Sequence, residues 1–188
     1  ALLRKRAPQA QLVFDTVDLH FLREQREAGV SGDERTRRAA ERSRQHELAL
    51  IAAVDRTWVV SPVERELLAS LAPTSQVDVV ATIYEAVEDS PGREGRSDMV
   101  FVGSFGHAPN ADAALWLAND ILPRVRERVP GAQLHLVGAD PPAQLQALAS
   151  SSGLRLHGHV ADLGALLDWC WVSGAPVRFG AGVKGKVS

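Results

Sequence analysis

Short apolar runs that alternate with amphipathic segments constrain the fold of this chain more than any other feature. In the second half, Met99–Gly103 and Leu134–Gly138 are almost wholly apolar, which is typical of parallel strands buried on both faces of a sheet. Between such runs, apolar residues recur at spacings of three and four, a pattern that predicts helices. Because strands that alternate with helices form right-handed βαβ units, the sequence predicts an α/β fold with parallel sheets.

The same criteria place the remaining elements. Further strands are expected over Gln11–Asp15, Thr57–Val60, Gln76–Ala81, Leu154–His157 and Cys170–Val177, and residues 15–20 are expected to be a strand-end loop. Helices are expected over Asp33–Val54, from Ser61, from Asn110 to a break at Pro123 near Leu122, after Pro142, and over Asp162–Asp168. Ser61 to Glu64 match a capping box, with Ser61 as the N-cap and Glu64 three residues later.

A polar segment divides the chain. Residues 85–98 are charged and interrupted by Pro91, Gly92 and Gly95, which is the composition of a linker. We therefore predict two domains, residues 1–84 and residues 99–188, joined by this linker. Strand–helix alternation restarts after it, so both halves are expected to be α/β.

The composition excludes several classes of protein. The 188 residues are 45% hydrophobic and 23% charged, as in a soluble globular protein, and the net charge of −2 disfavours a nucleic-acid partner. No apolar run reaches the roughly 18 residues that span a bilayer. The single cysteine, Cys170, fits a reducing compartment and a cytoplasmic location, and we expect it to be a small buried residue. Core positions are also expected for Trp58, Trp116, Trp169 and Trp171.

A glycine-rich cationic loop follows the last expected strand. It carries Arg178, Lys184 and Lys186 and is loosened by Gly180, Gly182 and Gly185. Glycines let a backbone approach a ligand closely, and successive N–H groups beside cations bind phosphate-sized anions. Because ligands of open α/β sheets bind at the carboxyl ends of the strands, the loop predicts a phosphate or diphosphate site. The alternative is a solvated basic turn.

A second loop of this kind, Gly103 to Asn110, connects an expected strand to a helix start. Gly103 and Gly106 allow backbone N–H groups to face a ligand, and the helix N-terminus adds a positive partial charge. His107 in this loop is expected to be a surface residue rather than a ligand contact. Two anion-binding loops at one sheet edge indicate a site more specifically than either loop alone.

Acidic and histidine side chains follow the first expected strand. Asp15, Asp18 and His20 could supply a general base there, or the acids could simply cap backbone N–H groups. The other histidines near strands, His135, His157 and His159, lack ligand spacing and are expected to be structural; no metal site is expected.

The order of these segments resembles the donor half of the group 1 (family 4-like) glycosyltransferases. The resemblance rests on Phe101–Asp112, Trp116 with Ile121–Pro123, Pro130–Gly138, Gly158 with Asp162 and Leu163, and Ala175–Lys186. Phe14–Glu24 and Val54–Ser61 are similar to the closing part of the acceptor domain of that family. The resemblance implies a retaining enzyme of the GT-B type, with two Rossmann-like parallel-sheet halves, each of them incomplete in a partial chain.

The resemblance also implies roles for individual residues. Arg178, Lys184 and Lys186, with Gly180 and Gly182, fall where such enzymes bind the donor diphosphate. The backbone of Gly103 and Ser104 falls where the loop meets the phosphates, and His20 or Asp18 falls where the acceptor domain offers a catalytic residue. The chain departs from the family pattern at Ser104, at Pro109 or Asn110, and at Ala181.

The function implied is sugar transfer from a nucleotide-sugar to a saccharide or lipid-linked acceptor in bacterial cell-surface polysaccharide or lipopolysaccharide synthesis. No cofactor or metal is expected, because lysines and an arginine can replace Mg²⁺ at the diphosphate. Peripheral contact with the inner face of the membrane remains open. The alternative is an inactive glycosyltransferase-like module that binds a nucleotide or a protein partner. A dinucleotide-dependent dehydrogenase is disfavoured, because no GxGxxG opens a helix after a strand.

Overall fold

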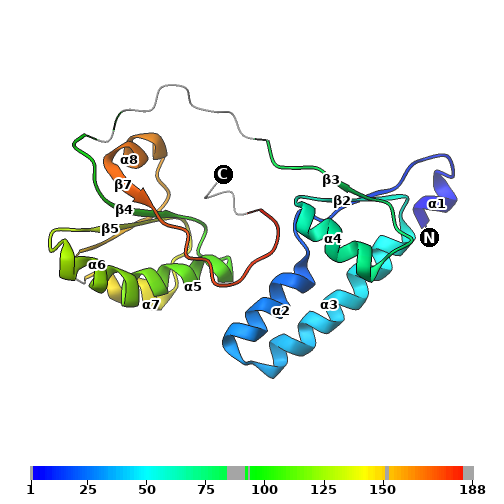
Figure 1. Cartoon of the computed structure of the whole chain (residues 1–188), viewed down its shortest axis with the longest axis horizontal. Helices are drawn as coiled ribbons and strands as arrows, with labels where there is room; N and C mark the ends of the chain where they lie inside the picture. Colours follow the sequence, from blue (N-terminus) through cyan, green and yellow to red (C-terminus); the bar gives the residue numbers. More distant parts are fainter. Residues whose placement is uncertain (1, 84–91, 93, 151–152, 184–188) are drawn as a thin grey trace. The chain divides into compact units, whose positions relative to one another are not determined.

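The structure is a computed structural model that describes residues 2–83, 92, 94–150 and 153–183 (Figure 1). Its contacts divide these residues into two units. The first unit contains residues 2–83 together with 179–183, and the second contains the described residues from 92 to 178. Each unit has its own wholly parallel sheet, so the predicted α/β fold with two parallel-sheet halves is confirmed.

The first unit is built on a three-stranded sheet in the order β1-β2-β3. Its strands are β1 (Val13–Asp15), β2 (Arg56–Val59) and β3 (Val77–Val79), and its helices are α1 (Leu2–Arg6), α2 (His20–Ser31), α3 (Glu34–Ala53) and α4 (Pro62–Leu71). Helices α2 and α3 pack side by side (Figure 1). The buried core consists of Leu19, Phe21, Ile51, Val59 and Leu68.

The N-terminal ends of the helices in this unit differ in how they are capped. Asp33 caps α3 by accepting hydrogen bonds from the amides of Arg35 (3.2 Å) and Thr36 (3.1 Å), so the helix starts where the sequence predicts. The Thr36 hydroxyl and these amides lower the pKa of the Asp33 carboxyl. Helix α2 was not predicted: the residue before it, Leu19, offers no side-chain cap. Its cap comes from a distant residue described below.

The second unit is built on a four-stranded sheet in the order β6-β5-β4-β7. Its strands are β4 (Ser97–Val102), β5 (Leu134–Val137), β6 (Leu154–His157) and β7 (Cys170–Ser173). Its helices are α5 (Ala108–Trp116), a π-helical stretch (Leu117–Ile121), α6 (Leu122–Arg128), α7 (Ala143–Leu148) and α8 (Leu163–Trp169). Helices α5 to α7 cover one face of the sheet and α8 covers the other (Figure 1).

The first helix of this unit differs from its prediction at both ends. It begins at Ala108 rather than after Asn110, whose side chain instead donates to the carbonyl oxygen of Ser104 (2.8 Å). Asn110 therefore ties the helix to the preceding loop and is not its cap. Regular α-helix ends at Trp116, before the π-helical stretch and Pro123. Because proline has no N–H to donate, a wider turn before it accommodates the lost hydrogen bond.

The prediction that the tryptophans are core residues is wrong. The exposed fractions are 37% for Trp58, 36% for Trp116, 57% for Trp169 and 55% for Trp171. Trp58 points to the face of β2 opposite the buried Thr57 and Val59. Trp171 lies on β7, an edge strand of its sheet. The prediction for Cys170 is confirmed: it is buried, and burial, aided by Asp98, raises the pKa of its thiol.

Among the described residues, no helix is long and apolar enough to cross a membrane.

Candidate functional site

The strand order of the second unit defines where a ligand would bind. Numbered along the chain, β6-β5-β4-β7 is the order 3-2-1-4, which matches the first part of the Rossmann order 3-2-1-4-5-6. In such sheets the order reverses between strands 1 and 4, here β4 and β7, and ligands bind at the carboxyl ends of the strands at that point. The two loops that the sequence analysis selected follow β4 and β7.

The loop after β4 is held tightly against the end of β5. The amides of Gly103 and Phe105 donate to the carbonyl oxygens of Val137 and Ala139, each at 2.9 Å. A Cβ added to Gly138 would lie 2.0 Å from the carbonyl oxygen of Gly103. The Gly103 N–H is thus used inside the sheet, so any contact of Gly103 with a ligand would have to use another atom.

Ser104 and Gly106 are two exposed residues of this loop that carry donors. Within the described residues, neither of their amides has a hydrogen-bond acceptor. The carbonyl oxygen of Ser104 is held by the Asn110 side chain, which keeps the turn next to the first turn of α5. This arrangement presents two backbone N–H groups and one hydroxyl at the strand end, which is suited to an anion.

Arg178, after β7, is bound to a carboxylate of α5. Its Nε donates to Asp112 (2.8 Å), and its Nη2 forms a second short bond to the same carboxylate. The guanidinium also lies 5.5 Å from the ring centre of Trp116. The hydrogen bond to Asp112, with smaller charge effects from Asp112 and Asp120, raises the pKa of Arg178. Arg178 is therefore oriented before any ligand binds, and it stays partly exposed.

The residues that follow Arg178 belong to the first unit. Gly182 has a left-handed backbone (φ 69°) and donates to Glu64 (2.9 Å), and Arg26 donates to the carbonyl oxygen of Gly180. The sequence analysis grouped both glycines with the second half of the chain. Two further predicted site residues, Lys184 and Lys186, lie outside the described residues.

Asp18 and His20 form a charged cluster where α2 begins. Asp18 accepts from Arg23 (2.8 Å) and lies 3.5 Å from His20 Nε2. His20 Nδ1 lies 3.3 Å from Glu47, and more than half of the His20 side chain is exposed. The structure thus brings Asp18 and His20 together, as a base and its neighbour would require. Asp15 instead accepts from the amide of Val17 (3.1 Å), the capping alternative.

Two buried glutamates also belong to this region, although the sequence did not predict it. Glu47 of α3 accepts from the amides of His20 (3.1 Å) and Phe21 (2.9 Å), and so it caps α2 from another helix. Glu64 accepts from the amides of Leu19 (3.4 Å) and Gly182. Glu64 was identified only as part of a capping box. The signal for Glu47 was a charged residue within the apolar face of a helix.

His135, His157 and Asp98 form a chain across the sheet of the second unit. His135 Nδ1 lies 3.0 Å from His157 Nε2, and His135 Nε2 lies 3.4 Å from the carboxylate of Asp98. Burial lowers the pKa of His157, as do the nearby His135 and Arg155. These side chains bond to one another, as structural residues do. Among the described residues, no group of three histidine, cysteine or acidic side chains could hold a metal ion.

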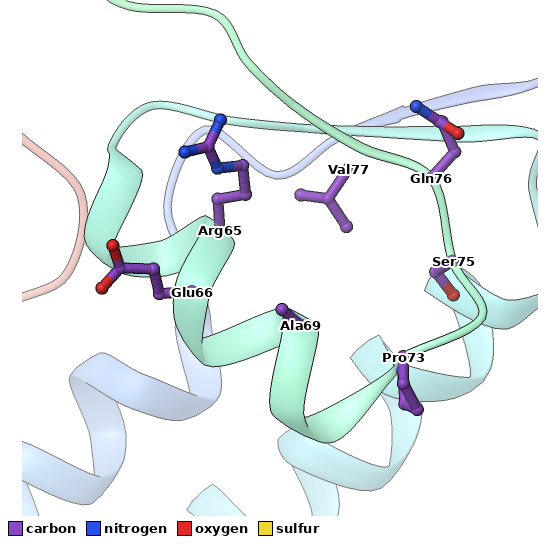
Figure 2. Close-up of a pocket in the computed structure, with 7 residues that line it drawn as sticks. All are labelled: Arg65, Glu66, Ala69, Pro73, Ser75, Gln76 and Val77. Atoms are coloured by element: carbon purple, nitrogen blue, oxygen red, sulfur yellow. The ribbon is translucent and has the colours of Figure 1, made fainter.

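Two of the hollows among the described residues lie away from the carboxyl ends of the strands. One, of about 330 Å³, lies between α4 and the start of β3 and is lined by Arg65, Glu66, Ala69, Pro73, Ser75, Gln76 and Val77 (Figure 2). The other, of about 790 Å³, lies at the amino ends of the second sheet, where Trp169 and Trp171 contribute to its walls. Neither contains a predicted site residue.

Comparisons with known proteins show what this arrangement resembles. Residues 96–188, the region that contains β4 to β7, match the family model described as glycosyl transferases group 1. Among the solved structures that resemble the chain are two of TarM. One, a crystal structure of TarM, has a TM-score of 0.56 at 9% identity and covers 70% of this chain and 27% of TarM.

A second similar structure is that of a mutant of S. aureus TarM in complex with fondaparinux, alpha-GlcNAc-glycerol and UDP. Its TM-score is 0.55 at 9% identity, again over 70% of this chain and 27% of that chain. The chain thus spans about a quarter of the length of these structures, and the likeness concerns the fold. A search of the curated proteins finds no sequence match.

Proposed function

We propose that this chain is part of a retaining glycosyltransferase that transfers a sugar from a nucleotide-sugar to a saccharide or lipid-linked acceptor in cell-surface polysaccharide or lipopolysaccharide synthesis. The observation that carries the proposal is that the loops after β4 and β7, on either side of the point where the strand order reverses, both offer groups that bind anions. The family match over residues 96–188 and the UDP in one TarM structure support a nucleotide-sugar donor.

In this proposal the second unit binds the donor. The amides of Ser104 and Gly106 and the guanidinium of Arg178 hold the diphosphate, with Gly103 shaping the loop and Lys184 and Lys186 adding charge. As the sugar leaves, negative charge develops on the diphosphate, and fixed cations stabilise it. Cations of the chain would take the place of a metal ion in this step. We place the reaction in the cytoplasm, because the single cysteine fits a reducing compartment.

The first unit contributes the acceptor side. His20, and next to it Asp18, are the proposed groups that contact the reacting sugar. His20 has the exposure that contact with a substrate requires, while its ring stays near two carboxylates, Asp18 and Glu47. A carboxylate beside an imidazole orients the ring.

A calorimetric titration of the chain with UDP and with GDP, with and without Mg²⁺, tests the proposal. We expect saturable binding of one nucleotide that does not need the metal. Replacing Arg178 with alanine should weaken this binding by about 1–3 kcal/mol, the range for a lost charge-assisted contact. The matched control is Arg124→Ala, on the exposed side of α6, which should leave binding unchanged.

The outcome also separates the two candidate functions of the chain. Metal-independent binding that Arg178→Ala weakens supports a working donor site. Absence of binding to either nucleotide, with a folded chain, would contradict a donor site in this stretch and favour the inactive interaction module.

A further inference from the structure

Glu64 makes hydrogen bonds that its position in a capping box does not explain. It lies in the first turn of α4 and only 2% of its surface is exposed. In a capping box its carboxylate would turn back to the Ser61 amide. One of the two hydrogen bonds of a capping box is present, since the Ser61 hydroxyl accepts from the Glu64 amide (3.2 Å). The Glu64 carboxylate instead accepts from the amides of Gly182 (2.9 Å) and Leu19 (3.4 Å) and from the Ser61 hydroxyl (3.3 Å).

The two amides belong to the two candidate site segments of the first unit. Leu19 stands between Asp18 and His20, and Gly182 ends the turn that starts at Gly180. Gly182 lies 118 positions from Glu64 along the chain, and Leu19 lies 45 positions from it. A single carboxylate thus joins two segments that no local sequence pattern connects.

The turn at Gly182 also packs closely against the same loop. A Cβ on Gly182 would lie 3.3 Å from the Cβ of Asp18 and 3.2 Å from a methyl group of Val60. The turn is further held by Arg26, which donates to the Gly180 carbonyl oxygen, and by Phe179, whose surface is only 6% exposed. The hydrogen bond to Glu64 therefore fixes a turn that already fits its surroundings.

We propose that Glu64 is a positioning residue that sets the Gly180–Gly182 turn against the Asp18–His20 loop. One carboxylate oxygen, Oε1, accepts both amides, and Oε2 accepts the Ser61 hydroxyl. A glutamine at this place would offer the two amides an uncharged oxygen and would turn an NH₂ group toward Ser61. With the carboxylate in place, the candidate diphosphate turn and the candidate catalytic residues share one arrangement. This consequence for a ligand rests on the function proposed above.

The first test measures amide-proton exchange by NMR in the whole chain without nucleotide. In Glu64→Gln we expect the Gly182 and Leu19 amides to exchange about tenfold faster, because the oxygen that accepts both hydrogen bonds loses its negative charge. The matched control is Glu66→Gln: Glu66 lies on the same helix, is exposed and lines the hollow of Figure 2. It should leave both amides unchanged. Unchanged exchange of Gly182 in Glu64→Gln would overturn the proposal.

A second variant keeps the carboxylate and alters the turn. In Gly182→Ala the added Cβ meets Asp18 and Val60, and the left-handed backbone becomes strained. We expect faster amide exchange over residues 180–183 and at Leu19, with the β5 amides unchanged. This variant decides the matter if Glu64→Gln fails to fold. If the Leu19 amide exchanges at the wild-type rate although the turn is displaced, the two segments are not joined.

Nucleotide binding then separates this inference from the proposed function. If the wild-type chain binds UDP or GDP, Glu64→Gln should lower the affinity about tenfold and Glu66→Gln should not. Equal affinity of wild type and Glu64→Gln would overturn the positioning role. If the wild-type chain binds neither nucleotide, the donor-site proposal fails, while the exchange measurements still decide whether Glu64 joins the two segments.

Discussion

At the scale of single residues, the partner of Arg178 determines how readily it can hold a diphosphate. The ion pair with Asp112 orients the guanidinium over Trp116, but it also places a negative charge beside the proposed phosphate position. The Arg178 side chain is 41% exposed, so solvent weakens this ion pair and an incoming phosphate can compete for it.

Replacing Asp112 with asparagine should therefore strengthen nucleotide binding. The amide keeps one acceptor for Arg178 and removes the repulsion, and we expect a gain of about 0.5–1 kcal/mol, the scale of an exposed ion pair. Calorimetry with the nucleotide that the wild type binds measures this directly. The matched control is Glu127→Gln, on the exposed side of α6, which also removes one negative charge. Weaker binding in Asp112→Asn would mean that orientation of Arg178 outweighs repulsion.

At the scale of the elements, the contact between the ends of β4 and β5 is the most tightly packed part of the candidate site. Gly138 has φ 153°, and a Cβ there would meet the Gly103 carbonyl carbon at 2.8 Å as well as its oxygen. The backbone of both turns would have to separate to admit any side chain.

Gly138→Ala should therefore destabilise the second unit by about 2–4 kcal/mol, since backbone strain and a clash act together. Chemical denaturation followed by the NMR signals of β5 measures the effect. Gly158→Ala is the control, because a Cβ at Gly158 meets nothing within 4 Å. Equal stability of the two variants would show that the strand ends separate easily.

The elements also show which features local sequence reveals. The apolar runs of β4 and β5 and the cap Ser61 act through neighbouring residues, and they could be predicted. Helix α2 could not, because its cap is Glu47 of another helix. The sequence identified Glu64 as a local capping residue. It did not reveal the bond of Glu64 to Gly182, because that bond depends on a residue 118 positions away. The loops after β4 and β7 were found because glycines and cations mark them directly.

At the scale of the whole molecule, the first unit is assembled from two separate stretches of chain. Residues 179–183 pack with residues 2–83, although Arg178, directly before them, belongs to the second unit. Sequence composition marked a boundary near residue 85 but gave no sign of this return, because the glycine-rich turn is continuous with the end of β7.

A substitution in the returning segment should affect the unit that it packs in. Phe179→Ala removes a buried aromatic side chain, and we expect the first unit to lose about 3 kcal/mol while the second unit keeps its stability. Denaturation curves from amide signals of α4 and of β5 report the two units separately. Val183→Ala, at a more exposed position of the same segment, should have little effect. A parallel loss in both units would contradict this division of the chain.

The hydrogen bond between Glu64 and Gly182 also has a consequence for biosynthesis. A ribosome adds roughly 5–20 residues per second, so the 118 positions that separate the two residues take on the order of ten seconds to translate. During that interval the Glu64 carboxylate lacks its Gly182 partner. Because residues 179–183 belong to the first unit, that unit is complete only after the second unit has been synthesised.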